Sequence, residues 1–304
     1  MGNRKWSRRE MLAAGIAGAG IGALRATVAG GMVWAKEDTP CALTPELTIG
    51  PYYVDYELMR RDIREGKAGV PLHLEIALQH ARTCAPIANA GVDVWHCDAH
   101  GVYSGYTKYS PDAMGPMGGG AGRPPDGPPP DGPPPSFDGG PGFAGGDAHG
   151  GPPRMKQSDQ ETFLRGVQFT NSDGVAEFLT IYPGWYVSRD THIHLEVHTG
   201  GTSAGKKYRG GHVCHIGQIA FPDAISDQVA ALEPYARHKV ERTRLDDDTV
   251  FHGDLSGVML KLEQLDGKDI SAGFRGKIIF VVDPEATPAP DGFGPPRNRS
   301  RAQS

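Results

Sequence analysis

The stretch VPLHLEIALQ, from Val70 to Gln79, decides the fold class of this 304-residue chain. Every second residue in it is apolar: Val70, Leu72, Leu74, Ile76 and Leu78. Successive side chains of a β-strand point to opposite faces, so this alternation is typical of a strand with one buried face. The stretch therefore predicts a β-strand at the start of the folded region.

Further strand-like segments follow, separated by turn signals such as Ser172-Asp173-Gly174 and Asp266-Gly267. They are Gly91–Ala99, Val102–Tyr106, Val175–Ile181, His192–His198, Val213–Phe221, Gly257–Leu265 and Lys277–Asp283. Seven or eight strands with little helix indicate an all-β fold, an antiparallel β-sandwich.

One short helix is predicted within Pro222–Tyr235. Ile225, Val229 and Leu232 share one face of it, and Asp223 could act as its N-cap.

The chain divides into a signal and linker at residues 1–38, one sandwich domain at 39–283, and a disordered tail at 284–304. Within the domain, residues 114–153 are rich in glycine and proline and lack the apolar side chains of a packed core. We interpret them as a long flexible insertion in a loop. A single domain is favoured because neither half supplies enough strands to bury a sandwich core alone.

The N-terminus reads as a targeting signal. Ser7-Arg8-Arg9-Glu10-Met11-Leu12 is a twin-arginine pattern, and a weakly apolar run rich in alanine and glycine follows it. This favours a twin-arginine-type export signal over a basic disordered arm, and predicts a periplasmic or extracellular protein. No apolar run reaches the roughly 20 residues of a membrane span. The net charge of −5 gives no reason to expect a nucleic-acid partner.

Two histidines of the stretch THIHLEVH, His192 and His194, flank a single isoleucine. In a strand both imidazoles would point to one face, where they form either a solvated polar surface or half of a metal site for Zn, Cu, Fe or Ni. Tyr186, just past the turn Pro183-Gly184, could face the same site. His198 shares the strand face but lies too far along to bind the same ion.

A second stretch, GVDVWHCDAHGVYSGY, ends in a turn followed by Tyr103. Spacing alone does not make Tyr103 a ligand, and His96 and His100 compete with it for that role.

The sequence resembles the intradiol ring-cleavage dioxygenases, the catechol and protocatechuate dioxygenase family, and within it the exported branch. Apart from the insertion, the similarity covers most of the region from Cys41 to Asp283 and rests on five ordered segments. They are TIGPYYVD (Thr48–Asp55), VDVWHCDAHGVYSGY (Val92–Tyr106), FLRGVQFTNSDGVAEFLTIYPGWY (Phe163–Tyr186), SRDTHIHLEV (Ser188–Val197) and GQIAFPD (Gly217–Asp223).

The resemblance implies a non-haem Fe(3+) site with four protein ligands, two tyrosines and two histidines: Tyr103, Tyr186, His192 and His194. It also implies an active-site arginine at Arg189 and a glutamine at Gln218, with Tyr186 acting as a base. Tyr52 and Tyr53 would line the substrate pocket, although a packing role explains them nearly as well. The insertion after Tyr106 departs from the family's pattern.

The implied activity is cleavage of a catechol-type ring between its two hydroxylated carbons with O2, giving a muconate-type dicarboxylic acid. Fe(3+) is a hard cation and prefers anionic oxygen, which explains two tyrosinates among its ligands. Two alternatives remain: a non-enzymatic transthyretin-like binding module, and a zinc or copper hydrolase on the same site. The partners expected are a small catechol-type molecule and O2, and the oligomeric state is left open, a homo-oligomer included.

Four cysteines in an exported chain suggest disulfides, with three pairings available. We pair Cys41 with Cys84, which would tie the N-terminal arm to the strand region. Cys97 and Cys214 would then pair or stay free. No Cys-x-x-Cys spacing occurs, which disfavours a zinc ribbon.

Overall fold

The computed structural model describes residues 41–112, 143–144 and 154–289. The predicted export signal, most of the 114–153 insertion and residues 290–304 lie outside this range. The elements described here all belong to the unit from Pro40 onward.

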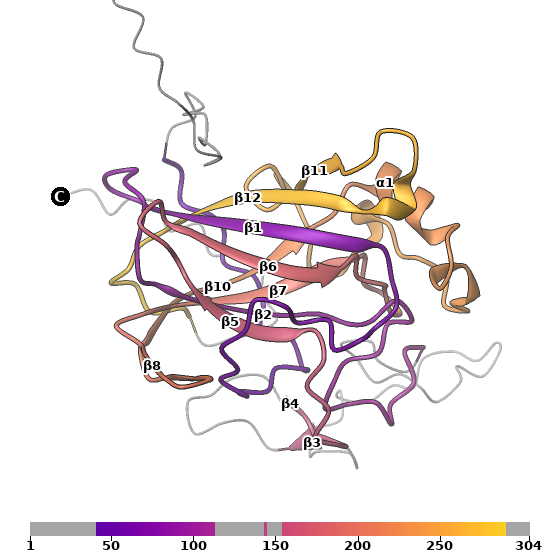
Figure 1. Ribbon diagram of the computed structural model, residues 1–304, viewed down its shortest axis with the longest axis horizontal. Coiled ribbons are helices and arrows are strands. Elements are labelled where there is room, and N and C mark those ends of the chain that lie inside the picture. Colours follow the sequence, from indigo (N-terminus) through magenta and orange to yellow (C-terminus); the bar gives the residue numbers. More distant parts are fainter. Residues whose placement is uncertain (1–40, 113–142, 145–153, 290–304) are drawn as a thin grey trace, which may run out of the picture. The chain divides into compact units, whose positions relative to one another are not determined.

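Two four-stranded sheets form the fold (Figure 1). The first has the order β11 (Lys261–Gln264), β12 (Phe274–Val282), β1 (Pro71–His80) and β6 (Val175–Ile181). The second has the order β10 (His212–Ala220), β7 (His192–Thr199), β2 (Gly91–Trp95) and β5 (Arg165–Phe169). Neighbouring strands are antiparallel except β1 and β12, which are parallel. The predicted β-sandwich is confirmed, with this one parallel pair as the difference.

Smaller elements join the strands. Two short hairpins are β3 (Phe143–Ala144) with β4 (Arg154–Met155), and β8 (Thr202–Ala204) with β9 (Lys207–Arg209). The described helices are α1 (Asp223–Ala230) and the single turns η1 (Tyr235–Arg237), η2 (Leu245–Asp247) and η3 (Ile270–Ala272). Within the described residues, none of these helices has the length and apolar character needed to span a membrane.

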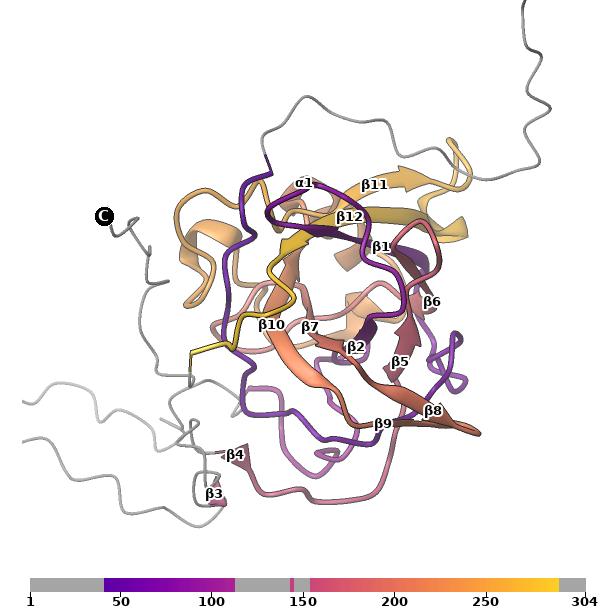
Figure 2. The ribbon, with the colours of Figure 1, turned by 90° about the vertical axis from the view of Figure 1, so that its left-hand side faces the viewer.

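Alternation along β7 separates a packing face from a chemical face. Ile193, Leu195 and Val197 are buried in the main apolar cluster, together with Leu74 and Ile76 of β1 in the other sheet. Each such buried side chain contributes about 1.5–3 kcal/mol to the stability of the fold. The intervening residues of β7 must then face away from the partner sheet. In Figure 2, the indigo segment that follows residue 41 runs along that outer side.

Two predictions about the strands need correction. Residues 102–106 form turns, because the Asp98 carboxylate accepts hydrogen bonds from the backbone N–H groups of His100 and Val102. Gly101 adopts a positive φ of 78°, which a strand does not allow. Conversely, β5 was not predicted, because RGVQF contains an arginine and a glycine that mask its alternation.

The helix prediction was right in position but wrong in its cap. Residue Pro222 precedes the first turn of α1 and makes no side-chain cap hydrogen bond, while Asp223 lies inside the first turn. The Asp223 carboxylate instead accepts a hydrogen bond from Arg242 at 2.6 Å. The ion pair therefore replaces the expected cap.

The predicted disulfide between Cys41 and Cys84 is present, with 5.7 Å between the two Cα atoms. Cys97 and Cys214 are both free and buried. The first residues of the predicted tail are tied to the domain, because Ala286 accepts a hydrogen bond from His212 Nε2 at 2.7 Å.

Candidate metal centre

The outer face of β7 places two imidazoles side by side in the middle of the second sheet. His194 lies opposite Trp95 of β2 on one side and Gln218 of β10 on the other, and His192 lies opposite Ala220. Strand periodicity alone puts the two imidazoles on one face, as the sequence predicted.

Four potential ligand atoms converge at His192. Its Nε2 atom lies 3.1 Å from His194 Nε2, and 3.4 Å from the hydroxyl oxygens of both Tyr103 and Tyr186. All four residues are at most 1% exposed. Tyr103 comes from the turn after β2, and Tyr186 from the segment between β6 and β7. The structure thus brings together the four residues that the motifs singled out.

The orientation of His192 is fixed by the backbone. Its Nδ1 atom hydrogen-bonds the carbonyl oxygen of Asp190 at 2.6 Å, which makes Nδ1 the protonated nitrogen and leaves a lone pair on Nε2. A ligating histidine ordinarily holds its other ring nitrogen in this way.

His194 is held by packing instead. Its ring stacks on Trp95, with centroids 5.1 Å apart and an angle of 4° between the planes. Gly50 packs against the same imidazole so closely that a Cβ there would lie 2.9 Å from His194 Cε1. Within the described part of the chain, His194 Nδ1 has no hydrogen-bond partner.

Burial sets the protonation of these groups. It raises the pKa of Tyr103 well above its usual value, and raises the pKa of Tyr186 to about 12 against the opposing effect of Arg189. It lowers the pKa of His192 and His194 well below the usual value of an imidazole. Without a cation the centre is therefore uncharged at neutral pH.

This donor set suits a ferric ion. A bound cation reverses the effect of burial on a phenol and deprotonates it, so two tyrosinates would offset much of the ion's charge. The neutral imidazoles already present the form that binds metal. The donor-to-donor distances of 3.1–3.4 Å are those of groups around one shared ion.

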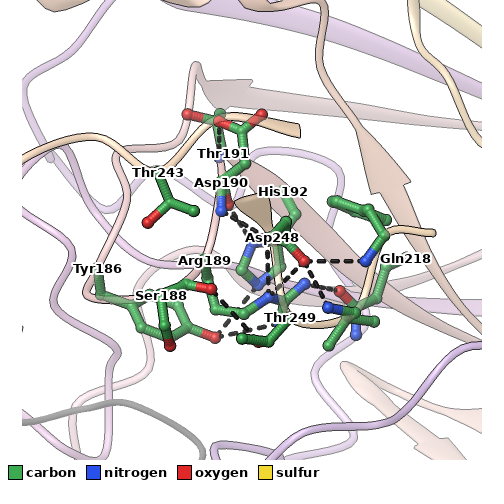
Figure 3. Close-up of polar contacts among 12 residues, drawn as sticks. Tyr186, Ser188, Arg189, Asp190, Thr191, His192, Gln218, Thr243, Asp248 and Thr249 are labelled. Atoms are coloured by element: carbon green, nitrogen blue, oxygen red, sulfur yellow. Dashed lines mark hydrogen bonds and ion pairs between the residues drawn. The ribbon is translucent and has the colours of Figure 1, made fainter. Parts of the chain in front are cut away.

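Arg189 lies beside the centre, 3% exposed, and contacts three partners (Figure 3). Its Nη2 donates to Gln218 Oε1 at 2.5 Å, and its Nη1 lies 3.5 Å from the Tyr186 hydroxyl. Gln218 Nε2 in turn donates to the carbonyl oxygen of Thr48 at 2.7 Å. The arginine and glutamine thus form one hydrogen-bonded unit at the edge of the four ligands.

The third partner, Asp248, was missed by the sequence analysis. Its carboxylate oxygens accept from Arg189 Nε at 3.0 and 3.1 Å, and the residue is 2% exposed. It also accepts backbone N–H bonds from Asp190, Val250 and Phe251. Asp248 follows two exposed aspartates in a run of three, and no local pattern marks it as the buried one.

The two predicted pocket tyrosines lie in different surroundings. Tyr52 stacks on Tyr103 with ring centroids 4.6 Å apart and meets Tyr186 edge-on at 5.7 Å, so it lies directly against the centre. Tyr53 packs edge-on to Trp95 at 4.8 Å. Burial raises the pKa of Tyr53, and the carboxylates of Asp93 and Glu196 raise it further.

The competing histidines lie apart from the centre. His96 is buried, with its ring nitrogens bonded to the carbonyl oxygen of Cys97 and to the Thr180 hydroxyl. His100 is exposed. His198 pairs with Glu196 farther along β7, at 3.4 Å.

Comparison with known proteins places this geometry in context. The chain is similar to the solved structure of an intradiol ring-cleavage dioxygenase from Tetranychus urticae, with 25% identity and a TM-score of 0.61. A second solved structure, also a dioxygenase, gives 25% identity and a TM-score of 0.58. Each comparison covers 82% of this chain and 98% of the other. No family model and no curated protein matches the sequence.

The resemblance to intradiol ring-cleavage dioxygenases, stated from the motifs, is therefore confirmed at the level of the fold. The structural neighbours are oxidoreductases, and the chain has the fold of this enzyme class.

Proposed function

We propose that the protein is a non-haem iron(III) intradiol dioxygenase that cleaves a catechol-type ring with O2 to a muconate-type dicarboxylic acid. The observation that carries the proposal is the convergence of two phenol oxygens and the His194 imidazole on His192 Nε2, at 3.1–3.4 Å from that atom. A transthyretin-like binding module has no need of such a buried set.

Tyr103, Tyr186, His192 and His194 would hold the ion. When bound, Fe(3+) would ionise the two phenols and activate a coordinated catechol toward O2.

Tyr186 is the residue we assign to move a proton. Its hydroxyl lies 3.5 Å from Arg189 Nη1, so the guanidinium stabilises the phenolate form that accepts a proton from a substrate hydroxyl. Among the described residues, the Tyr103 hydroxyl makes no hydrogen bond to Arg189 and instead contacts His192 Nε2, while Tyr52 stacks on its ring. We therefore assign Tyr103 a ligand role only.

Arg189 would stabilise negative charge that develops on the ring during cleavage, an electrostatic role that strengthens in a buried site. Gln218 receives one of its N–H groups and holds the guanidinium toward the centre. Tyr52, against both tyrosine ligands, would form one wall of the substrate pocket.

Iron loading of the purified protein tests the proposal. We expect a red colour from tyrosinate-to-iron charge transfer, together with oxygen uptake on at least one of catechol, protocatechuate, hydroxyquinol and chlorinated catechols. Tyr103→Phe should lose both, while Tyr109→Phe, on the same loop with its hydroxyl bonded to the Lys156 carbonyl, should keep both.

The rivals give different results. Protein that stays colourless after iron loading would support the binding module. Stoichiometric zinc in freshly isolated, active protein would support the hydrolase.

A further inference from the structure

A second group of potential metal ligands lies on the same outer face as the candidate iron centre, two residues farther along β7. Glu196 and His198 continue the alternation that places His192 and His194 on that face. Asp93 of β2 lies directly opposite Glu196 in the strand register. The sheet therefore brings two carboxylates and one imidazole together.

The three side chains are close enough to share one ion. His198 Nε2 is 3.4 Å from Glu196 Oε2, and one ligand atom from each residue lies within 4.8 Å of the other two. Zinc binds imidazole nitrogen and carboxylate oxygen at about 2.0–2.2 Å in a tetrahedral arrangement, so two ligands of one ion lie roughly 3.3–3.6 Å apart. The His198–Glu196 distance already fits this range, and side-chain movements of about 1 Å would close the rest of the group around a cation.

Charge also favours a cation here. Asp93 is 8% and Glu196 4% exposed. Among the described residues, neither carboxylate forms an ion pair with a lysine or arginine. Burial raises the pKa of Asp93 well above its usual value; the nearby Arg165 guanidinium opposes that shift, but its hydrogen bonds go to Ser104 and the Tyr52 carbonyl. Two facing buried carboxylates that form no ion pair with a lysine or arginine are costly unless a proton or metal ion neutralises them.

A buried hydroxyl without a partner lies at the His198 end of this group. Tyr208 is 4% exposed, and its hydroxyl has no hydrogen-bond partner in the described part of the chain. Its ring meets His198 edge-on at 5.4 Å. A Cβ at Gly91, which lies opposite His198, would be 2.8 Å from the Tyr208 hydroxyl oxygen. This hydroxyl therefore lies on the face that carries the two carboxylates.

We propose that Asp93, Glu196 and His198 form a second metal site, separate from the candidate iron centre, for a divalent transition-metal cation such as Zn²⁺. One nitrogen and two carboxylate oxygens suit a divalent ion, whereas the tyrosine-rich centre suits a ferric one. A cation here would link β2 to β7, the strand that carries His192 and His194. It would also lie beside Tyr53, whose neighbour Tyr52 covers the centre.

Zinc titration of chelator-stripped, full-length protein tests this site. Removing one of three ligands should weaken the affinity at least about 100-fold, because loss of a mere supporting partner already costs about 10–100-fold. We expect that loss in Asp93→Asn and in His198→Asn. The matched control Glu177→Gln, an exposed carboxylate paired with Arg61, should bind zinc like wild type.

A His192→Ala variant separates this site from the iron centre. We expect this variant still to bind one equivalent of zinc at Asp93, Glu196 and His198 although its iron centre is disrupted. The second site is therefore tested independently of the dioxygenase assignment. Loss of the equivalent in His192→Ala, or its full retention in folded Asp93→Asn and His198→Asn, would overturn the second site.

Crystals of wild-type protein soaked in Zn²⁺ provide a readout that does not depend on the folding of variants. An anomalous difference peak between Asp93, Glu196 and His198 is the expected result. Zinc density elsewhere in the molecule, with none at these three residues, would refute the proposal.

Discussion

The contact between Asp248 and Arg189 offers a direct test of how the candidate centre is positioned. Asp248 accepts from Arg189 Nε and from three backbone N–H groups, so it fixes both the guanidinium and the segment that carries it. Asp248→Asn keeps the side-chain shape and one acceptor oxygen but removes the negative charge that neutralises the buried guanidinium. The substitution should therefore leave the ligands in place and loosen the arginine.

The magnitudes follow from the geometry. Breaking a buried ion pair costs about 3–5 kcal/mol of stability, and retention of one acceptor oxygen puts Asp248→Asn at the lower end. A misplacement of about 1 Å in a positioned group lowers the rate of turnover about 100-fold. Loss of Arg189 itself should lower it about 100- to 1,000-fold, as removal of other charge-stabilising donors does.

A double-mutant cycle on the iron-loaded protein measures the coupling, with oxygen uptake on the best catechol as the assay. If Asp248 acts through Arg189, the double variant Asp248→Asn with Arg189→Ala should turn over no more slowly than Arg189→Ala alone. All variants should keep the charge-transfer colour, and Asp247→Asn, the exposed neighbour, should match wild type. Additive losses in the double variant, or an unchanged rate in Asp248→Asn, would refute the reasoning.

Three further outcomes are expected. Replacing Cys41 and Cys84 with alanine should lower the free energy of unfolding by roughly 4 kcal/mol, from the entropy of closing a 43-residue loop; an unchanged denaturation midpoint would contradict this. Gly50→Ala should lose iron far more readily than Gly66→Ala, since both have positive φ but only the first meets an imidazole; equal iron retention would show that the close approach is unimportant. Burial lowers the pKa of His96 to about 4, so the folded protein binds this proton less readily than the unfolded chain. Its contribution to stability should be full above about pH 6.5 and fall by up to about 3 kcal/mol toward pH 4. In urea melts, wild type should therefore lose about that much more stability than His96→Asn, in which other buried histidines such as His215 still titrate; equal losses would contradict the prediction.

Much of the fold could be predicted from short-range patterns. Alternation in Val70–Gln79 and His192–His198 predicted β1 and β7 closely, because residues two apart in a strand share a face whatever surrounds them. The same rule placed His192 and His194 together. Patterns failed where side chains override propensity, as at Val102–Tyr106, where the Asp98 carboxylate binds backbone N–H groups and makes a turn.

The candidate centre required more than periodicity. The family motifs pointed to Tyr103 and Tyr186, but their position beside His192 depends on two turns and on the packing of Tyr52. Asp248 comes 59 residues after Arg189, from a segment with no motif, and only the fold joins them.

The sequence by itself determined the strand periodicity and the two imidazoles on one face, because both depend on backbone geometry between near neighbours. Its four cysteines allowed three pairings, and the fold selected Cys41 with Cys84 by bringing their Cα atoms to 5.7 Å. Only the tertiary structure decided that Asp93 of β2 would lie opposite Glu196 of the neighbouring strand β7, and that Asp248 would neutralise a buried arginine. Strand register and loop packing set those contacts, and both arise from interactions between residues far apart in the chain.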